Sequence, residues 1–370
     1  MALFLSTVLL LAVFVSFLLC HLLTATRPTR SSLFLASLAS VFFGFDNFLI
    51  AYAGRLLKPA EYMSMMFLAI FCVAALGSSL VACTCPSFKE EARDLWKASR
   101  MQRFWIVASG ALIALAQTSA CMSFSLDEVD SGPLQSIVIA NVPIVGIFFY
   151  FWSNETLSKI QLLGCASIMG GITCMFWNDS PEESSGFDNS SSSSFTSSFA
   201  WICISTLFYA LSIITIRFAG EEELPERPKS LAIVLSSGFL GFVVLRFSLC
   251  GKLLFALHLE VLMWASLNAV ASMLGLLSVV LSYEVPEAKM ALATALIDSN
   301  AVPMCGLNFV LLGAVPGTSK LVGMALVLLG CAAGFMGPKP DEMPPVQKLS
   351  DLLLEGSMDG RRLSTRQGHG

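Results

Sequence analysis

Hydrophobic runs of membrane-spanning length recur along the whole chain, and this feature restricts the fold most. They lie at residues 2–24, 31–54, 62–84, 104–125, 132–153, 158–177, 198–218, 230–250, 258–282, 288–313 and 318–337. About 20 residues of α-helix cross the hydrocarbon core of a bilayer. Backbone N–H and C=O groups in lipid must pair within their own segment, so these runs form helices. The sequence therefore predicts an all-α, polytopic membrane protein.

Charge and cysteine usage argue against several other classes. Only 13% of the residues are charged, the net charge is −4, and no basic patch with interleaved aromatic residues occurs, so we expect no nucleic-acid partner. The 11 cysteines lie mostly inside the hydrophobic runs, as small buried residues do. The three histidines are scattered, and no nucleophile motif or carboxylate cluster appears. We therefore predict no metal, no cofactor and no enzymatic activity.

Basic residues orient the helices. We place Arg27 and Arg30 in the cytoplasm and let each run from residue 31 onward cross once. Of the 22 Lys and Arg, those that then fall on the opposite side are Arg55, Lys58, Arg246, Lys252 and Lys320. The run at 2–24 lacks the basic start of a secretory signal and is longer than its apolar core. We therefore interpret residues 1–30 as an extra N-terminal transmembrane helix or signal anchor, and residues 338–370 as a disordered cytoplasmic tail.

A serine-rich, acidic loop at 178–197 interrupts the hydrophobic runs, and the topology places it outside the cell or in a lumen. Within it, Asn189-Ser190-Ser191 is a glycosylation sequon, although serine-rich stretches also produce such sequons by chance. A lumenal sequon favours a eukaryotic endomembrane or plasma membrane over a bacterial inner membrane.

The hydrophobic region contains an internal repeat. The segment SSLFLASLASVFFGFDNFLIAYAG (31–54) aligns without gaps on SSFAWICISTLFYALSIITIRFAG (197–220), and IANVPIVG (139–146) aligns on SNAVPMCG (299–306). In the helices that follow, Gly164 and Gly171 align with Gly323 and Gly330. A nearly constant offset over several helices predicts two repeats, which we place at 31–177 and 198–337.

Each predicted repeat has five helices, an odd number, so the two copies insert in opposite orientations. Inverted repeats are the architecture of many secondary transporters, in which the solute site lies between the halves near the middle of the membrane. The sequence thus predicts a ten-helix inverted-repeat transporter core plus one N-terminal helix. It would move a small polar metabolite by alternating access, coupled to protons or to exchange.

Residues 31–337 resemble the drug/metabolite transporter superfamily of the EamA type. The best match is SGPLQSIVIANVPIVGIFFYFWSNETLSKIQLLGCASIMGGI, where a helix with a central Pro ends in an Asn-Glu-x-Leu-Ser turn before a Gly-rich helix. The second copy of that turn reads GAVPGTSK and lacks the Glu. The resemblance implies ten core helices with cytoplasmic ends and transport of metabolites such as nucleotide sugars, amino acids or sugar phosphates.

Polar residues inside the runs are candidate solute ligands. An ionisable group deep in a bilayer costs about 2.5 kcal/mol or more, so it usually faces a cavity or a partner. Asp298 lies near the centre of its run, close to Asn300 and Pro303. We expect Asp298 and Asn300 to line the site, with Asp298 as a proton or cation carrier. The alternative is that Asp298 is bonded to its neighbours and serves packing alone.

Further solute-binding candidates are Asp46, Asn47, Gln117, Asn141 and Asn268. Such residues can instead hold helices together, at about 0.6 kcal/mol each, and Asp46 could reach the far interface. Pro143 and Pro303 are the predicted helix breaks, because proline lacks an N–H donor.

The remaining expectations concern packing and partners. We expect the glycine rows in 164–171 and 323–334 to allow close helix packing. The expected partners are a small-molecule solute and the lipid bilayer, and the chain could also form a homodimer. The alternative function is a non-transporting receptor or assembly subunit that keeps the transporter fold.

Overall fold

A computed structural model describes residues 32–56, 58–126, 131–153, 159–177, 191–219, 226–249, 259–283, 297, 299–313 and 317–335. The N-terminal run at 2–24, the sequon at Asn189, the predicted carrier Asp298 and the tail at 338–370 lie outside these residues.

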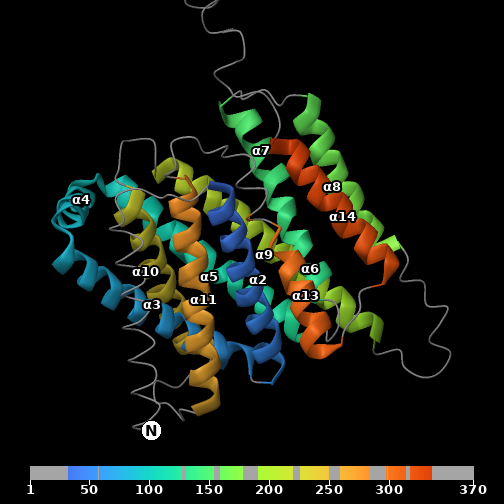
Figure 1. Cartoon of the computed structure of the whole chain (residues 1–370), viewed down its shortest axis with the longest axis horizontal. Helices are drawn as coiled ribbons and strands as arrows, with labels where there is room; N and C mark the ends of the chain where they lie inside the picture. Colours follow the sequence, from blue (N-terminus) through green and yellow to red (C-terminus); the bar gives the residue numbers. More distant parts are fainter. Residues whose placement is uncertain are drawn as a thin grey trace, which may run out of the picture.

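The described part of the chain is helical and contains no strand (Figure 1). The helices are α2 (Ser32–Leu56), α3 (Pro59–Thr84), α4 (Pro86–Lys97), α5 (Arg100–Leu126), α6 (Ser131–Ile137), α7 (Asn141–Ser153), α8 (Lys159–Trp177), α9 (Ser191–Ala219), α10 (Glu226–Val244), α11 (Leu259–Tyr283), α13 (Ala301–Leu312) and α14 (Thr318–Phe335). A 3-10 segment, η1 (Val138–Ala140), separates α6 from α7, and a π-helical segment, η2 (Leu245–Leu249), extends α10.

Five helical segments of the described residues are long and apolar enough to cross a bilayer. They are Leu35–Gly54, Pro59–Thr84, Arg100–Leu126, Thr196–Ile216 and Pro228–Phe247. Shorter apolar helices cover Leu134–Phe148, Leu162–Met175, Ala301–Leu312 and Thr318–Gly330. The predicted all-α class is confirmed for the described residues, and their apolar helices mark a membrane-embedded protein.

The helices pack in antiparallel pairs that join the first part of the chain to the second. The most extensive contacts are those of α5 with α9 and of α8 with α14, followed by α2 with α11 and α3 with α10. Hydrogen bonds set the direction of the α5–α9 pair. The Ser123 hydroxyl donates to the Ser198 carbonyl at 2.7 Å, whereas Ser109 lies opposite Thr215, with 2.7 Å between their hydroxyl oxygens. Residue numbers rise along α9 as they fall along α5, so the two helices run antiparallel.

Glycines bring α8 and α14 together, as the sequence predicts. A Cβ atom on Gly171 would lie 2.6 Å from the Gly323 carbonyl oxygen, and one on Gly330 would lie 2.6 Å from the Gly164 carbonyl oxygen. A side chain at either position would therefore force the backbones apart. These contacts also make α8 and α14 antiparallel, and Figure 1 shows the two helices side by side at the edge of the molecule.

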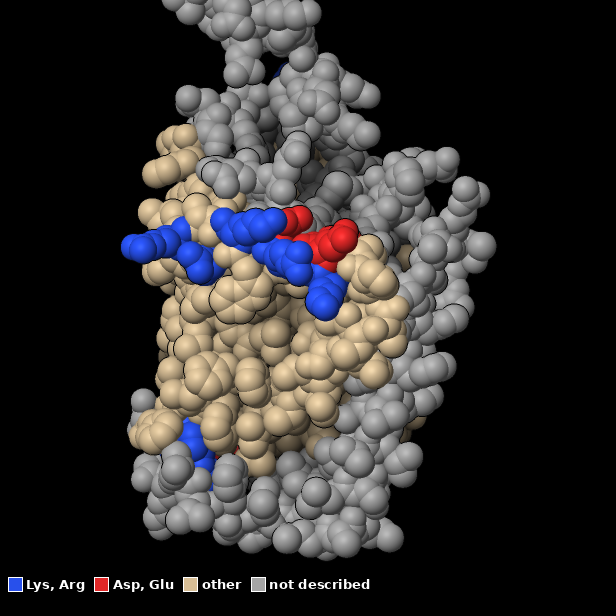
Figure 2. All heavy atoms as spheres, turned by 90° about the vertical axis from the view of Figure 1, so that its left-hand side faces the viewer, with Lys and Arg blue, Asp and Glu red and all other residues tan. Residues whose placement is uncertain are grey.

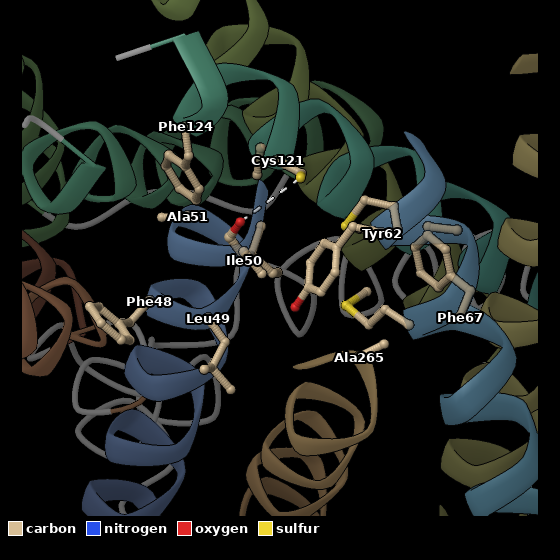
Figure 3. Packing of buried hydrophobic residues seen from close by; sticks show 14 of the residues in the cluster. Phe48, Leu49, Ile50, Ala51, Tyr62, Phe67, Cys121, Phe124 and Ala265 are labelled. Carbon is tan, nitrogen blue, oxygen red and sulfur yellow. Dashed lines mark hydrogen bonds between the residues drawn. The ribbon is translucent and has the colours of Figure 1, made fainter. Parts of the chain in front are cut away.

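The largest buried cluster draws on helices from both parts of the chain. Figure 3 shows residues of α2, α3, α5 and α11 meeting there, including Ile50, Tyr62, Cys121 and Ala265. Met304 of α13 and Ile202 of α9 belong to the same cluster. Burial of this apolar surface holds together segments that are more than 200 residues apart in the sequence.

The connection between α3 and α5 forms a helix that the hydrophobic runs do not reveal. Pro86 occupies the first turn of α4, where proline is tolerated, and Phe88 is buried while most other side chains are exposed. Helix α4 contacts α3 and α10. Figure 2 shows Lys and Arg side chains gathered in a band on this face, above a broad surface of uncharged residues. A charged band beside an uncharged surface is the pattern expected at a membrane boundary.

We expect Gly171→Ala to destabilise the protein, because the new methyl group would collide with the Gly323 carbonyl. Overpacking of this kind costs about 1–3 kcal/mol of unfolding free energy. Thermal or denaturant unfolding of the purified protein measures the change. The matched control is Gly170→Ala, since a Cβ atom there meets no atom within 4 Å. Equal stability of the two variants would contradict the close packing.

Candidate functional site

The helix that contains Pro143 is broken just before this residue. Proline has no N–H to offer the carbonyl four residues earlier, at Ile139, and its ring crowds that carbonyl. The structure places the 3-10 segment η1 at this point, between α6 and α7. Tight 3-10 turns inside a longer helix often mark strained or functional positions.

A second break precedes Pro303. Residues Ser299 and Asn300 form a turn, and α13 begins at Ala301. Because Pro303 cannot donate to the Ser299 carbonyl, the Val302 N–H donates to it instead, at 3.0 Å. The Met304 N–H donates to the Asn300 carbonyl at 3.3 Å.

The two breaks lie against each other. The Gln135 side-chain amide of α6 donates to the Asn300 side-chain oxygen at 3.3 Å, and the Asn308 amide of α13 donates to the Ser131 hydroxyl at 2.9 Å. These two bonds make α6 and α13 antiparallel neighbours. By residue count, the η1 break lies about 10 Å from the start of α6, and the turn before α13 lies about 18 Å from the end of α13.

Helix α2 packs against the break before Pro303. The hydroxyl oxygens of Ser40 and Ser299 lie 3.1 Å apart. A Cβ atom on Gly44 would lie 2.5 Å from the Pro303 ring and 2.8 Å from the Asn300 carbonyl oxygen. Glycine at this position therefore permits the close approach of α2 to the start of α13. We call the five residues Ser40, Gln135, Asn141, Ser299 and Asn300 the break site.

The break site contains buried polar atoms that no described residue satisfies. Gln135 is 5% exposed and Asn141 is 7% exposed, yet the side-chain oxygen of each lacks a hydrogen-bond partner within the described residues. Buried polar groups are nearly always paired with protein or ordered water, so such atoms are available to a bound solute or water.

A second polar set follows one face of α11. Trp264, Asn268 and Ser272 are spaced four residues apart, so their side chains share a face. We call these three residues the α11 stripe. The Trp264 ring packs edge-on against Tyr52 with centroids 5.3 Å apart, and the fully buried Asn268 amide donates to the Tyr62 hydroxyl at 2.7 Å.

Asp46 of α2 meets the last member of the α11 stripe. The Ser272 hydroxyl donates to an Asp46 carboxylate oxygen at 2.5 Å, and Asp46 is only 3% exposed. Among the described residues, Asp46 forms no ion pair. The structure thus places an acidic side chain between α2 and α11 with a hydroxyl group as its hydrogen-bond partner.

The other residues that the sequence predicted as solute ligands fall at different places in the structure. Asn47 is buried beside Asp46 on α2, Asn268 belongs to the α11 stripe, and Asn141 and Asn300 belong to the break site. Gln117 is half-buried on α5, and its side-chain oxygen has no partner among the described residues. Asp298, the first candidate from the sequence, lies outside the described residues.

Sequence reasoning missed Tyr62, Trp264 and Gln135. Each lies within a hydrophobic run and carries a polar atom, which is the signal that singled out the other candidates. Tyr62 and Trp264 pass for ordinary apolar residues in a hydropathy scan because most of each side chain is ring.

A groove on α7 is a separate feature. Its lining residues are Ile144, Ile147, Phe148, Phe151 and Trp152, and its volume is about 360 Å³. All five are apolar and most are exposed, as on a surface that faces lipid. A polar solute is not expected there.

We expect Tyr62→Phe to lower the unfolding free energy by about 0.5–1 kcal/mol, because it leaves the buried Asn268 amide without its acceptor. A double-mutant cycle with Asn268→Ala measures the coupling between the two side chains. The control is Tyr52→Phe, which keeps the ring contact with Trp264. No coupling in the cycle would contradict the buried hydrogen bond.

Comparisons with known proteins do not identify a family. No protein-family model matches the chain, and no curated protein matches its sequence. A solved structure described as "Crystal structure of protein" is similar over 82% of this chain and 95% of the other, with 13% sequence identity and a TM-score of 0.48. A similarity at this level assigns neither a fold nor a function to this chain.

Proposed function

We propose that this protein transports a small polar metabolite by alternating access between two inverted five-helix repeats, at 31–177 and 198–337. The observation that carries the proposal is the pairing of repeat-related helices. Helix α8 packs on α14 and α3 on α10. The internal alignment makes α8 equivalent to α14, and the order of the helices in the two repeats makes α3 equivalent to α10. Helices α6 and α13, which also pack together, belong to the equivalent hydrophobic runs 132–153 and 288–313. Equivalent helices that run antiparallel come from repeats of opposite orientation.

The contacts of α8 and α14 support this relation at the level of single residues. The alignment equates Gly164 with Gly323 and Gly171 with Gly330. Gly171 contacts Gly323. When each of these two residues is replaced by its equivalent in the other repeat, the pair becomes Gly330 with Gly164, and this contact also occurs. A two-fold axis in the plane of the membrane would produce this exchange.

The remaining helix pairs follow the same rule. Helix α2 is equivalent to α9, and α11 is equivalent to α5. The exchange therefore converts the α2–α11 pair into the α9–α5 pair, and both are among the most extensive contacts. This agreement supports ten core helices, although five of the helical segments reach spanning length by themselves.

The solute site is proposed at the break site, where α6, α13 and α2 meet. In transporters with inverted repeats, solutes bind near mid-membrane at discontinuous helices, whose freed backbone groups and polar side chains meet the solute. Within the described residues, the side-chain oxygens of Gln135 and Asn141 have no hydrogen-bond partner and can accept from a solute. Polar side chains without a fixed charge suit a neutral or zwitterionic metabolite. We also propose that the protein belongs to the EamA-type transporters. Its proposed location is a eukaryotic endomembrane or plasma membrane.

We expect the purified protein in liposomes to take up at least one zwitterionic member of a panel of labelled amino acids, sugar phosphates and nucleotide sugars. The same compound should raise the melting temperature in a dose-dependent way, since a ligand that binds the folded state stabilises it. Gln135→Ala or Asn300→Ala should reduce uptake about tenfold or more, because each removes a polar contact worth about 1.5 kcal/mol.

The control for this experiment is Thr173→Ala. Thr173 is exposed on α8 and its hydroxyl donates to its own helix, so uptake should be unchanged. A chain that responds to no compound but retains a stable protein partner on purification would instead be a receptor or assembly subunit.

A further inference from the structure

Asp46 lies deep in the membrane. It precedes Gly54, the last residue of the candidate span Leu35–Gly54, by eight residues, which corresponds to about 12 Å along the helix. That distance is close to half the ~30 Å thickness of the hydrocarbon core. A carboxylate at this depth is strongly disfavoured unless a positive charge or a proton accompanies it.

The surroundings of Asp46 favour a proton over a larger cation. Among the described residues there is no group of three or more side chains that could hold a metal ion. The described hydrogen bond comes from Ser272, and Phe48, Leu49 and Ile50 are buried in the next turn of α2. A metal ion needs several oxygen ligands, whereas a proton needs only the carboxyl group itself.

The titratable groups around Asp46 are weak acids. Tyr62 of α3 and Tyr209 of α9 lie within electrostatic reach of its carboxyl group, and Cys121 of α5 faces the neighbouring Ile50 carbonyl. Glu61 and Lys58, by contrast, are exposed at the α2–α3 connection, where they pair with each other at 3.8 Å. No described neighbour therefore supplies the charge that an ionised Asp46 would need.

We infer that Asp46 is the proton-carrying residue of the transport cycle, with Ser272 as the residue that positions it. The inference rests on the proposed transport function and assigns the carrier role to Asp46, whereas the sequence favours Asp298, which lies outside the described residues. One O–H bond forms when the carboxylate takes a proton from the aqueous phase on one side. The same bond breaks when the proton passes to the phase on the other side. The proton gradient across the membrane is the energy source.

Infrared spectroscopy tests proton binding without any solute. At neutral pH, the protein in liposomes should show the C=O band of a buried, protonated carboxyl group. Asp46→Asn should remove that band, and Ser272→Ala should shift its frequency because the hydrogen bond is lost. Asp94→Asn is the control, since Asp94 is exposed on α4 and paired with Lys97 at 2.8 Å. The inference is overturned if the band survives in Asp46→Asn or disappears in Asp298→Asn instead.

Flux measurements test coupling, using the panel compound that gives the highest uptake. An inward proton gradient should raise its accumulation several-fold in the native protein. Asp46→Asn should abolish that rise while still exchanging labelled for unlabelled compound at equal pH. A rise that persists in Asp46→Asn overturns the proton-carrier role. If the native protein moves no compound at all, the transport function fails, and the infrared result still decides whether Asp46 holds a proton.

Discussion

Unpaired backbone groups are not tolerated in lipid, and the rest of this structure depends on that constraint. It makes the hydrophobic runs helical, and it allows a helix to break only where protein covers the break. The breaks before Pro143 and Pro303 meet this condition, because α6, α13 and α2 pack around them and side chains of Gln135, Asn308 and Ser40 bond across them. These breaks in the regular helix thus also carry available polar groups.

The same constraint explains how polar side chains are used. Away from the breaks, many serine and threonine hydroxyl groups donate hydrogen bonds to carbonyls of their own helix, as those of Thr118 and Thr206 do. Other side chains bond between helices, as Ser123 and Ser205 do between α5 and α9. Those of the α11 stripe do so at α2 and α3, and one of them reaches a carboxyl group. In the proposed transporter, this separates a neutral region at the breaks from an acidic one at Asp46.

The helix positions could be predicted from the sequence because hydropathy depends on local composition. The run at 104–125 corresponds to α5, and the run at 258–282 corresponds to α11 within a few residues. Gly171 and Gly330 were also predictable packing positions, because small residues in rows have one common use in membrane helices. Helix α4 could not be predicted from hydropathy, because its charged sequence resembles a loop. Only the structure shows that Phe88 is buried and that the segment is a helix.

The side-chain hydrogen bonds between helices that are far apart in the sequence could not be predicted. Nothing in the sequence near Asp46 points to Ser272, which is 226 residues away, and the same holds for Tyr62 and Asn268. Such pairs depend on which helix faces which, and the packing of the whole bundle decides this. The internal repeat predicted which helices are equivalent, but neither the helix pairs nor the side chains that meet between them.

Thiol accessibility tests alternating access at the break site directly. A single cysteine replaces Asn300 in a cysteine-free form of the protein, and a membrane-impermeant thiol reagent is applied from each side in turn. Alternating access predicts labelling from both sides, with the transported compound slowing the reaction from each. Labelling from one side only, whatever compound is present, would contradict it.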